Sequence, residues 1–299
     1  MQKKSSTSRR LSRAAATALA LLTSATMVAA LVGAGPASAK SRRVAAWAPA
    51  ATAQIHPGVQ MYTDGAQCTG NFVFSDASGA TYVGYAAHCA GTGAATDTNG
   101  CDAQSLPLGT RVDFVEGGTL VTEGTRVGGC TLVYSSWLTM QQRNESDEDA
   151  CAYNDFALVK VDAADVAKVN PSVPFWGGPV AVNTTGTAAG ETVYSYGNSS
   201  LRGGIQELSP KQGVSLGTEG NGWTHPVYTV SPGVPGDSGS AFLDGEGNAV
   251  GTLSTLALAP LAGSNGVGDL HHELGYAQQH GGLTGLRLVP GTEPFSPIL

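Results

Sequence analysis

Short apolar runs, separated by clusters of glycine, aspartate, asparagine and serine, recur along most of the chain. Residues 71–75 form one such run, residues 76–79 have the composition of a turn, and residues 82–86 form the returning strand. Residues 241–254 repeat this pattern, with a turn at 244–248. Many short strands at this spacing predict an all-β barrel or sandwich.

One segment near the end of the chain has the periodicity of a helix. Leu270, Leu274 and Ala277 share one face at helical spacing. Asp269 can cap the first turn, and the Gly281-Gly282 pair is typical of a helix end. We therefore expect a helix between these two signals.

The beginning of the chain predicts a secretory signal peptide over residues 1–39. Residues 1–13 hold five cations and no acid, and residues 14–35 are apolar and small. Residues 37–39 (Ala-Ser-Ala) supply the small side chains that signal peptidase accepts. A membrane anchor is the alternative, but a cleavage site follows the apolar stretch at once. We expect a secreted, extracellular protein.

The remaining chain divides near a cluster of prolines and glycines at residues 170–179. Residues 40–54 are interpreted as a leader or mobile arm. We expect an N-terminal β-barrel over residues 55–172, and a C-terminal β-barrel with a helix and tail over residues 173–299. No repeat of fixed period is visible.

The composition agrees with strands joined by tight turns. The 299 residues include 41 glycines, and charged residues make up 13% of the chain against an average of about 25%. Hydrophobic residues, at 41%, suffice for a core, which excludes disorder throughout. The same numbers exclude a coiled coil or helical bundle.

The charge argues against two classes of partner. Removing the signal peptide takes five cations from the 16, which leaves 11 against 23 acids and a net charge near −12. Nucleic acid and anionic membranes are therefore not expected as partners.

The cysteine content favours disulfides, because all five cysteines lie in the exported part of the chain. Zinc is disfavoured, since the sequence contains no Cys-x-x-Cys pair. An odd number leaves one thiol over. The five are Cys68, Cys89, Cys101, Cys130 and Cys151.

Three short segments carry candidate chemistry. They are residues 86–89 (Ala-Ala-His-Cys), 154–158 (Asn-Asp-Phe-Ala-Leu) and 235–240 (Pro-Gly-Asp-Ser-Gly-Ser). Taken singly, each has a structural explanation as a loop, a strand start or a turn. Taken together, they supply a serine nucleophile, a histidine suited to accept its proton, and an aspartate that can orient the histidine.

These segments resemble the three catalytic motifs of the chymotrypsin-like (trypsin-fold) serine peptidases of the bacterial secreted type. The resemblance runs from about Ile55 to the predicted helix. It implies two six-stranded antiparallel β-barrels with the active site in the cleft between them. It also implies that Ser238 is the nucleophile, that His88 is the general base and then acid, and that Asp155 orients His88. The N–H groups of Gly236 and Ser238 would then bind the oxyanion.

The resemblance also implies a disulfide between Cys68 and Cys89, around the histidine loop. Cys101 with Cys151 is favoured as the second pair, which would connect the two catalytic segments of the first half. The alternative pairs Cys130 with Cys151.

In the animal digestive members of this family, the acid before the catalytic serine pairs with a freed N-terminal ammonium. In this chain that acid is Asp237. Here the candidate start is Ile55, and Pro57 makes the match to that start poor. We expect Asp237 to pair with an internal cation or polar group, so that no cleavage before Ile55 is needed.

The specificity pocket is expected to involve Pro232 at its floor, together with Ser254 and Leu256. With no acid at position 232, small or medium apolar side chains should be preferred over basic ones. His225 could read an acidic substrate, as in glutamyl endopeptidases; the alternative is a surface or strand-end histidine.

These observations predict a secreted serine endopeptidase that forms an acyl-enzyme and acts on proteins or peptides. No cofactor is implied, no metal-ligating set emerges, and a monomer is expected. One alternative is a non-catalytic binding module on the same scaffold. Another is an esterase of the α/β-hydrolase type, which is disfavoured because Ser240 replaces the second glycine of Gly-x-Ser-x-Gly.

Overall fold

The computed structural model describes residues 46–94, 97–256 and 263–297, which cluster as one compact unit. The predicted signal peptide lies outside the described residues. Within them, no helix has both the length and the apolar character that a membrane crossing requires.

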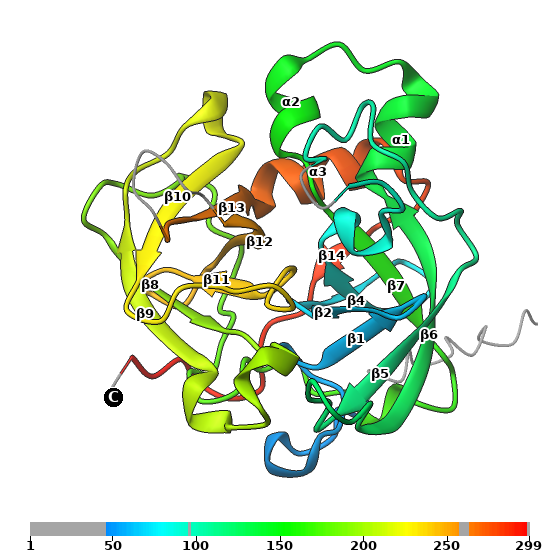
Figure 1. Ribbon diagram of the computed structural model, residues 1–299, viewed down its shortest axis with the longest axis vertical. Coiled ribbons are helices and arrows are strands. Elements are labelled where there is room, and N and C mark those ends of the chain that lie inside the picture. Colours follow the sequence, from blue (N-terminus) through cyan, green and yellow to red (C-terminus); the bar gives the residue numbers. More distant parts are fainter. Residues whose placement is uncertain (1–45, 95–96, 257–262, 298–299) are drawn as a thin grey trace, which may run out of the picture. The chain divides into compact units, whose positions relative to one another are not determined.

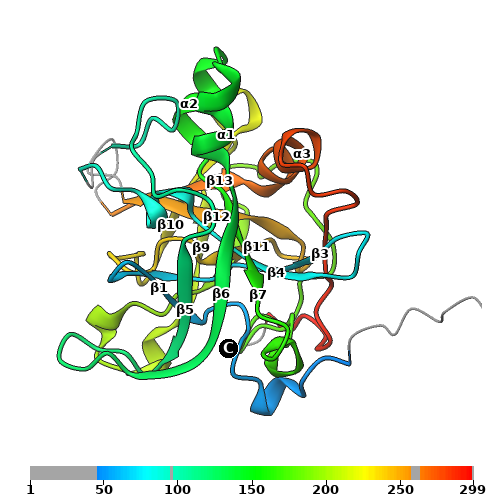
Figure 2. The same cartoon turned by 90° about the vertical axis from the view of Figure 1, so that its right-hand side faces the viewer.

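The first sheet is antiparallel throughout and has the strand order β14-β3-β4-β7-β6-β5-β1-β2. Figures 1 and 2 show that it is strongly curved. Its strands are β1 (Gln60–Thr63), β2 (Ala66–Thr69), β3 (Val73–Ser75), β4 (Thr81–Tyr85), β5 (Arg111–Glu116), β6 (Thr125–Ser135), β7 (Ala157–Val161) and β14 (Arg287–Leu288).

This sheet closes through one bent strand. Strands β2 and β3 are separated only by residues 70–72, whose backbone continues the pairing. The Gly70 N–H donates to the Val59 carbonyl (2.9 Å), and the Asn71 N–H donates to the Gly84 carbonyl (2.8 Å). Counted as one strand, β2-β3 pairs with β1 at its start and with β4 at its end. The sheet is therefore a six-stranded barrel, to which the tail adds β14 beside β3.

The second sheet is a closed barrel with the order β10-β13-β12-β11-β8-β9. The expected pair of six-stranded antiparallel barrels is thus confirmed, and Figure 1 shows them side by side. The strands are β8 (Thr192–Tyr196), β9 (Pro210–Ser215), β10 (Thr224–Thr229), β11 (Ala241–Leu243), β12 (Ala249–Leu256) and β13 (Asn265–Asp269).

The helices are few and short, as the glycine-rich composition predicts. The expected late helix is confirmed as α3 (Leu270–His280), where the Asp269 side chain accepts from the His272 N–H (2.8 Å). The other helices are α1 (Ser136–Arg143) and α2 (Glu148–Tyr153), with short 3-10 helices η1 (Ala50–Thr52), η2 (Ala87–Ala90), η3 (Val166–Lys168), η4 (Ser200–Arg202), η5 (Gln206–Leu208) and η6 (Gly220–Gly222).

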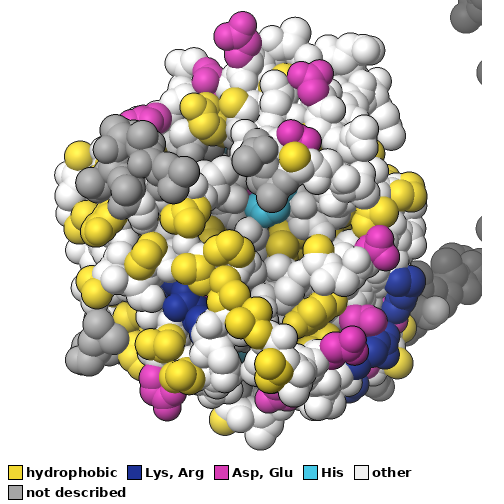
Figure 3. Space-filling model, viewed as in Figure 1, with side chains coloured by type: hydrophobic (Ala, Val, Ile, Leu, Met, Phe, Trp, Pro, Cys, Tyr) yellow, Lys and Arg dark blue, Asp and Glu magenta, His cyan; other side chains and the backbone are white. Residues whose placement is uncertain are grey.

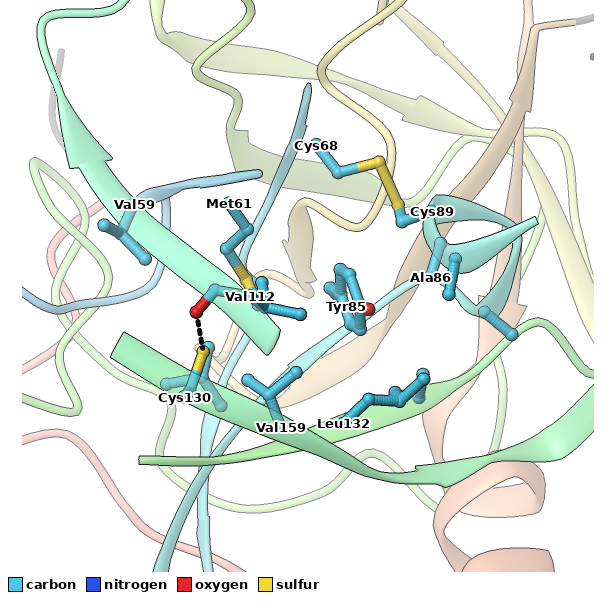
Figure 4. Close-up of a cluster of buried hydrophobic side chains, with 14 of the residues drawn as sticks. Val59, Met61, Cys68, Tyr85, Ala86, Cys89, Val112, Cys130, Leu132 and Val159 are labelled. Carbon is cyan, nitrogen blue, oxygen red and sulfur yellow. Dashed lines mark hydrogen bonds between the residues drawn. A yellow bond between two sulfur atoms is a disulfide. The ribbon is translucent and has the colours of Figure 1, made fainter. Parts of the chain in front are cut away.

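Three apolar clusters hold these elements together. One fills the first barrel and includes Met61, Val112 and Cys130, whose thiol donates to the Val112 carbonyl (3.3 Å; Figure 4). Another fills the second barrel around Phe242. The remaining cluster combines side chains of both barrels and α3, among them Trp176. This shared apolar layer fixes one barrel against the other, and hence the position of any site between them.

Candidate active site

Two disulfides anchor the segments that carry the candidate residues. Cys68 at β2 is joined to Cys89 in η2, the turn that contains His88. Cys101 is joined to Cys151 in α2, the helix that ends just before Asp155. Cys130 is unpaired and buried. The favoured pairings are therefore those of the structure.

The His88 ring is held by the Asp155 carboxylate. Nδ1 of His88 lies 2.6 Å from Oδ2 of Asp155, and the His88 backbone N–H donates to Oδ1 (2.8 Å). The Ser254 hydroxyl also donates to Oδ2 (2.6 Å). A carboxylate can only accept, so Nδ1 carries the proton and Nε2 is left free to accept one. The buried Asp155 thus orients the ring and selects its tautomer.

The same contact controls the protonation of His88. Burial by itself lowers the pKa of the imidazole, since the charged form loses its hydration. The charge of Asp155 and its hydrogen bond act in the opposite direction and outweigh burial, so the pKa of His88 is raised above 6.5.

A cleft of about 580 Å³ brings the three candidate side chains together. His88, Asp155 and Ser238 all line it, as do Ser254 and Leu256. Figure 3 shows a histidine in a hollow of the molecular surface, bordered by apolar side chains. Among the described residues, no hydrogen bond joins the Ser238 hydroxyl to the His88 ring.

The Ser238 backbone is tied to both barrels. The Thr69 N–H donates to the Ser238 carbonyl (2.8 Å), and the Gly239 N–H donates to the Leu253 carbonyl (2.7 Å). A Cβ at position 239 would lie 2.3 Å from the Thr69 carbonyl oxygen, so only glycine permits this approach.

The turn before Ser238 presents two backbone donors. Gly236 has φ +94°, a conformation that favours glycine, and its carbonyl accepts from the Thr69 hydroxyl (2.7 Å). Within the part of the chain that the structure describes, the N–H groups of Gly236 and Ser238 have no acceptor. Two such donors can stabilise an oxyanion.

Asp237, between these two residues, is fully buried and paired with two cations. Its Oδ2 is bonded to Nη2 of Arg202 and lies 3.0 Å from Nζ of Lys211. Burial raises the pKa of Asp237, but Lys211 and Arg202 more than offset that effect and hold the pKa below 3.8. The expected internal cation is confirmed. The Ile55 N–H instead donates to the Lys168 carbonyl (3.2 Å).

Two other expected residues lie elsewhere. Pro232 is not among the described residues that line the cleft, and its carbonyl accepts from Nη2 of Arg202 (3.4 Å). His225 is at the start of β10 but is fully buried, with Nε2 2.8 Å from Oδ2 of Asp269. It is therefore neither a surface histidine nor a wall of the cleft.

Sequence reasoning missed Asn265, which lines the cleft from the first position of β13. It also missed the identity of both partners of Asp237. No local motif surrounds any of these residues, so only their contacts across the fold reveal them.

No family model matches the chain, and no curated protein matches it. Among solved structures, it is similar to Thermobifida fusca protease A, with 19% identity and a TM-score of 0.46 over 79% of this chain and 99% of that one. It is also similar to Nocardiopsis protease (18%, TM-score 0.44, 78% and 98%) and Cellulomonas bogoriensis chymotrypsin (17%, TM-score 0.45, 79% and 98%).

The chain has the trypsin-like fold. The two barrels, their strand pairing and α3 carry this assignment. In this trypsin-like arrangement, His88 and Asp155 belong to the segments of the first barrel and Ser238 to those of the second, and the cleft lies where they meet.

Proposed function

We propose that the protein is a secreted serine endopeptidase that hydrolyses peptide bonds through Ser238, His88 and Asp155. The observation that carries this proposal is the cleft itself. It joins an oriented imidazole, a serine hydroxyl and two backbone donors that have no acceptor among the described residues in one water-accessible cavity.

The reaction follows from the roles of these groups. Nε2 of His88 removes the Ser238 proton as Oγ attacks the carbonyl carbon of the scissile bond. The resulting oxyanion accepts from the N–H groups of Gly236 and Ser238. His88 then donates its proton to the leaving amine, and water hydrolyses the acyl-enzyme by the same steps. The contact between Ser238 and His88 is expected to form when substrate is bound, because catalytic hydrogen bonds commonly tighten in the complex.

The maturation and location of the enzyme form part of the proposal. The two disulfides suit an oxidising compartment outside the cell. Because Arg202 and Lys211 already neutralise Asp237, we expect activity without cleavage before Ile55. Edman sequencing of active, monomeric enzyme tests this, and a sole N-terminus at Ile55 would refute it.

Labelling with a fluorophosphonate tests the nucleophile. The folded protein should form a single adduct on Ser238, and Ser238→Ala should lose both labelling and peptide hydrolysis. Ser146→Ala, an exposed serine outside the cleft, is the matched control and should retain both. Absence of an adduct on folded wild-type protein would favour a non-catalytic binding module. Turnover of esters with no turnover of any peptide would favour an esterase.

A further inference from the structure

One end of the cleft, beside Ser238, is a slot between two walls. One wall is the segment 233–236, which leads to the serine, and the other is the end of β12, residues 253–256. Asn265 of β13 lies between them and is opposite Leu256 in the sheet register. This slot is where a substrate side chain next to the scissile carbonyl would be placed.

The Asn265 side chain bridges the two walls. Its Oδ1 accepts from the Gly233 N–H (2.8 Å), and its Nδ2 donates to the carbonyls of Gly233 (3.3 Å) and Thr255 (3.1 Å). These partners also determine the orientation of the amide, since one is a donor and two are acceptors. Asn265 is only 1% exposed. The amide therefore closes the inner end of the slot, and both of its polar atoms are hydrogen-bonded.

Because the amide joins Gly233 to Thr255 at the inner end of the slot, a substrate side chain that reached that end would have to displace it. Displacement would take the side-chain acceptor from the N–H of buried Gly233 and one donor from the carbonyls of Gly233 and Thr255, which is unfavourable. The described residues of the slot also offer no charge to a substrate, because Val234, Thr255 and Leu256 are neutral and the nearby Asp237 is already paired with its two cations.

We propose that Asn265 determines specificity by holding this slot short, so that the enzyme cleaves after small uncharged residues such as alanine. This inference rests on the proposed peptidase function. It identifies the residue responsible for a preference for small side chains and narrows that preference to exclude large apolar ones.

Four peptides that differ only in the residue before the cleaved bond test the inference: Ala, Leu, Phe and Lys. Wild-type enzyme should cleave after Ala on the order of tenfold or more faster, in kcat/KM, than after any of the others. Asn265→Ala and the milder Asn265→Ser should each raise the Leu:Ala and Phe:Ala ratios by about tenfold or more. Asn248→Ala, in the turn between β11 and β12 and outside the cleft, should leave the ratios unchanged.

Fluorophosphonate labelling of the same proteins separates the two hypotheses. Absence of labelling in folded wild-type enzyme would contradict the peptidase proposal itself. Labelling together with preferred cleavage after Leu, Phe or Lys by the wild type would overturn the inference about Asn265 alone. Unchanged ratios in both Asn265 variants, with labelling retained, would overturn it as well.

Discussion

The ion pairs of Asp237, in the turn before Ser238, predict unequal effects on stability for two similar substitutions, Arg202→Met and Lys211→Met. The Arg202 side chain is 9% exposed and bonds both oxygens of the fully buried Asp237. It also donates to the Ser231 hydroxyl (3.2 Å) and the Pro232 carbonyl (3.4 Å). Lys211 contacts only one Asp237 oxygen, at 3.0 Å.

Burial also penalises Lys211 itself. Desolvation lowers the pKa of Lys211, and the charge of Arg202 lowers it further, although Asp237 acts in the opposite direction. Removing Lys211 therefore relieves a desolvation cost and leaves Asp237 paired with Arg202. Removing Arg202 leaves a carboxylate and two polar groups without their main partner.

We expect Arg202→Met to lower the free energy of unfolding by about 3–5 kcal/mol, the usual cost of breaking a buried pair. Lys211→Met should cost less than about 3 kcal/mol, the lower end of that range, because Nζ of Lys211 contacts Asp237 as a charge but has no hydrogen-bond partner among the described residues. Because the turn holds the Gly236 and Ser238 N–H groups, Arg202→Met should also reduce kcat/KM, up to about the 10²–10³-fold loss of one oxyanion donor.

Urea unfolding of both variants measures the stability change, with the slope checked against wild type. Arg111→Met is the control, since its pair with Asp162 is solvent-exposed and should contribute only about 0–1 kcal/mol. An Arg202→Met loss below about 1 kcal/mol, or a larger loss for Lys211→Met than for Arg202→Met, would contradict the assigned role of Arg202 as the main partner of Asp237.

Three further predictions follow from the same structure. Because the pKa of His88 is raised above 6.5 and the base must be neutral, kcat/KM should rise with pH through a value above 6.5. Asp155→Asn should lower the pH at which kcat/KM rises and reduce kcat on the order of 10⁴-fold. A wild-type kcat/KM that does not change with pH would contradict the role of His88. Burial, followed by the charge of Asp155, raises the pKa of Glu273 well above 4.5, so the folded state binds this proton more tightly than the unfolded state. Wild-type stability should therefore fall relative to Glu273→Gln as pH rises above 4.5, and parallel stability curves from chemical unfolding would exclude this. Replacing Cys68 and Cys89 together by alanine should cost about 3 kcal/mol in the same assay, and a change below about 1 kcal/mol would show that the crosslink contributes little.

The parts of the fold that depend on neighbouring residues could be predicted. The hairpin predicted over residues 71–86 corresponds to β3 and β4, and the hairpin over 241–254 corresponds to β11 and β12. The helix after Asp269 begins at its predicted cap. Each of these elements is specified within a few residues by alternation, turn chemistry or a cap, and no distant partner is needed to recognise it.

The parts that depend on distant partners could not be predicted residue by residue. The need of Asp237 for an internal cation could be inferred, but not that Arg202 and Lys211 would supply it. The tail strand β14 joins the first barrel although it follows the second in the chain. Asn265 carries no motif, and only the amide contacts across the slot reveal it.

The sequence by itself determined the kinds of chemical group available and the short elements that carry them, because motifs, turns and caps are local patterns. Which groups meet in the cleft, which charges are neutralised beneath it and which amide joins the walls of its slot depend on the three-dimensional fold. Those contacts join residues far apart in the chain, and barrel closure and burial select them from many pairings that composition and spacing leave equally possible.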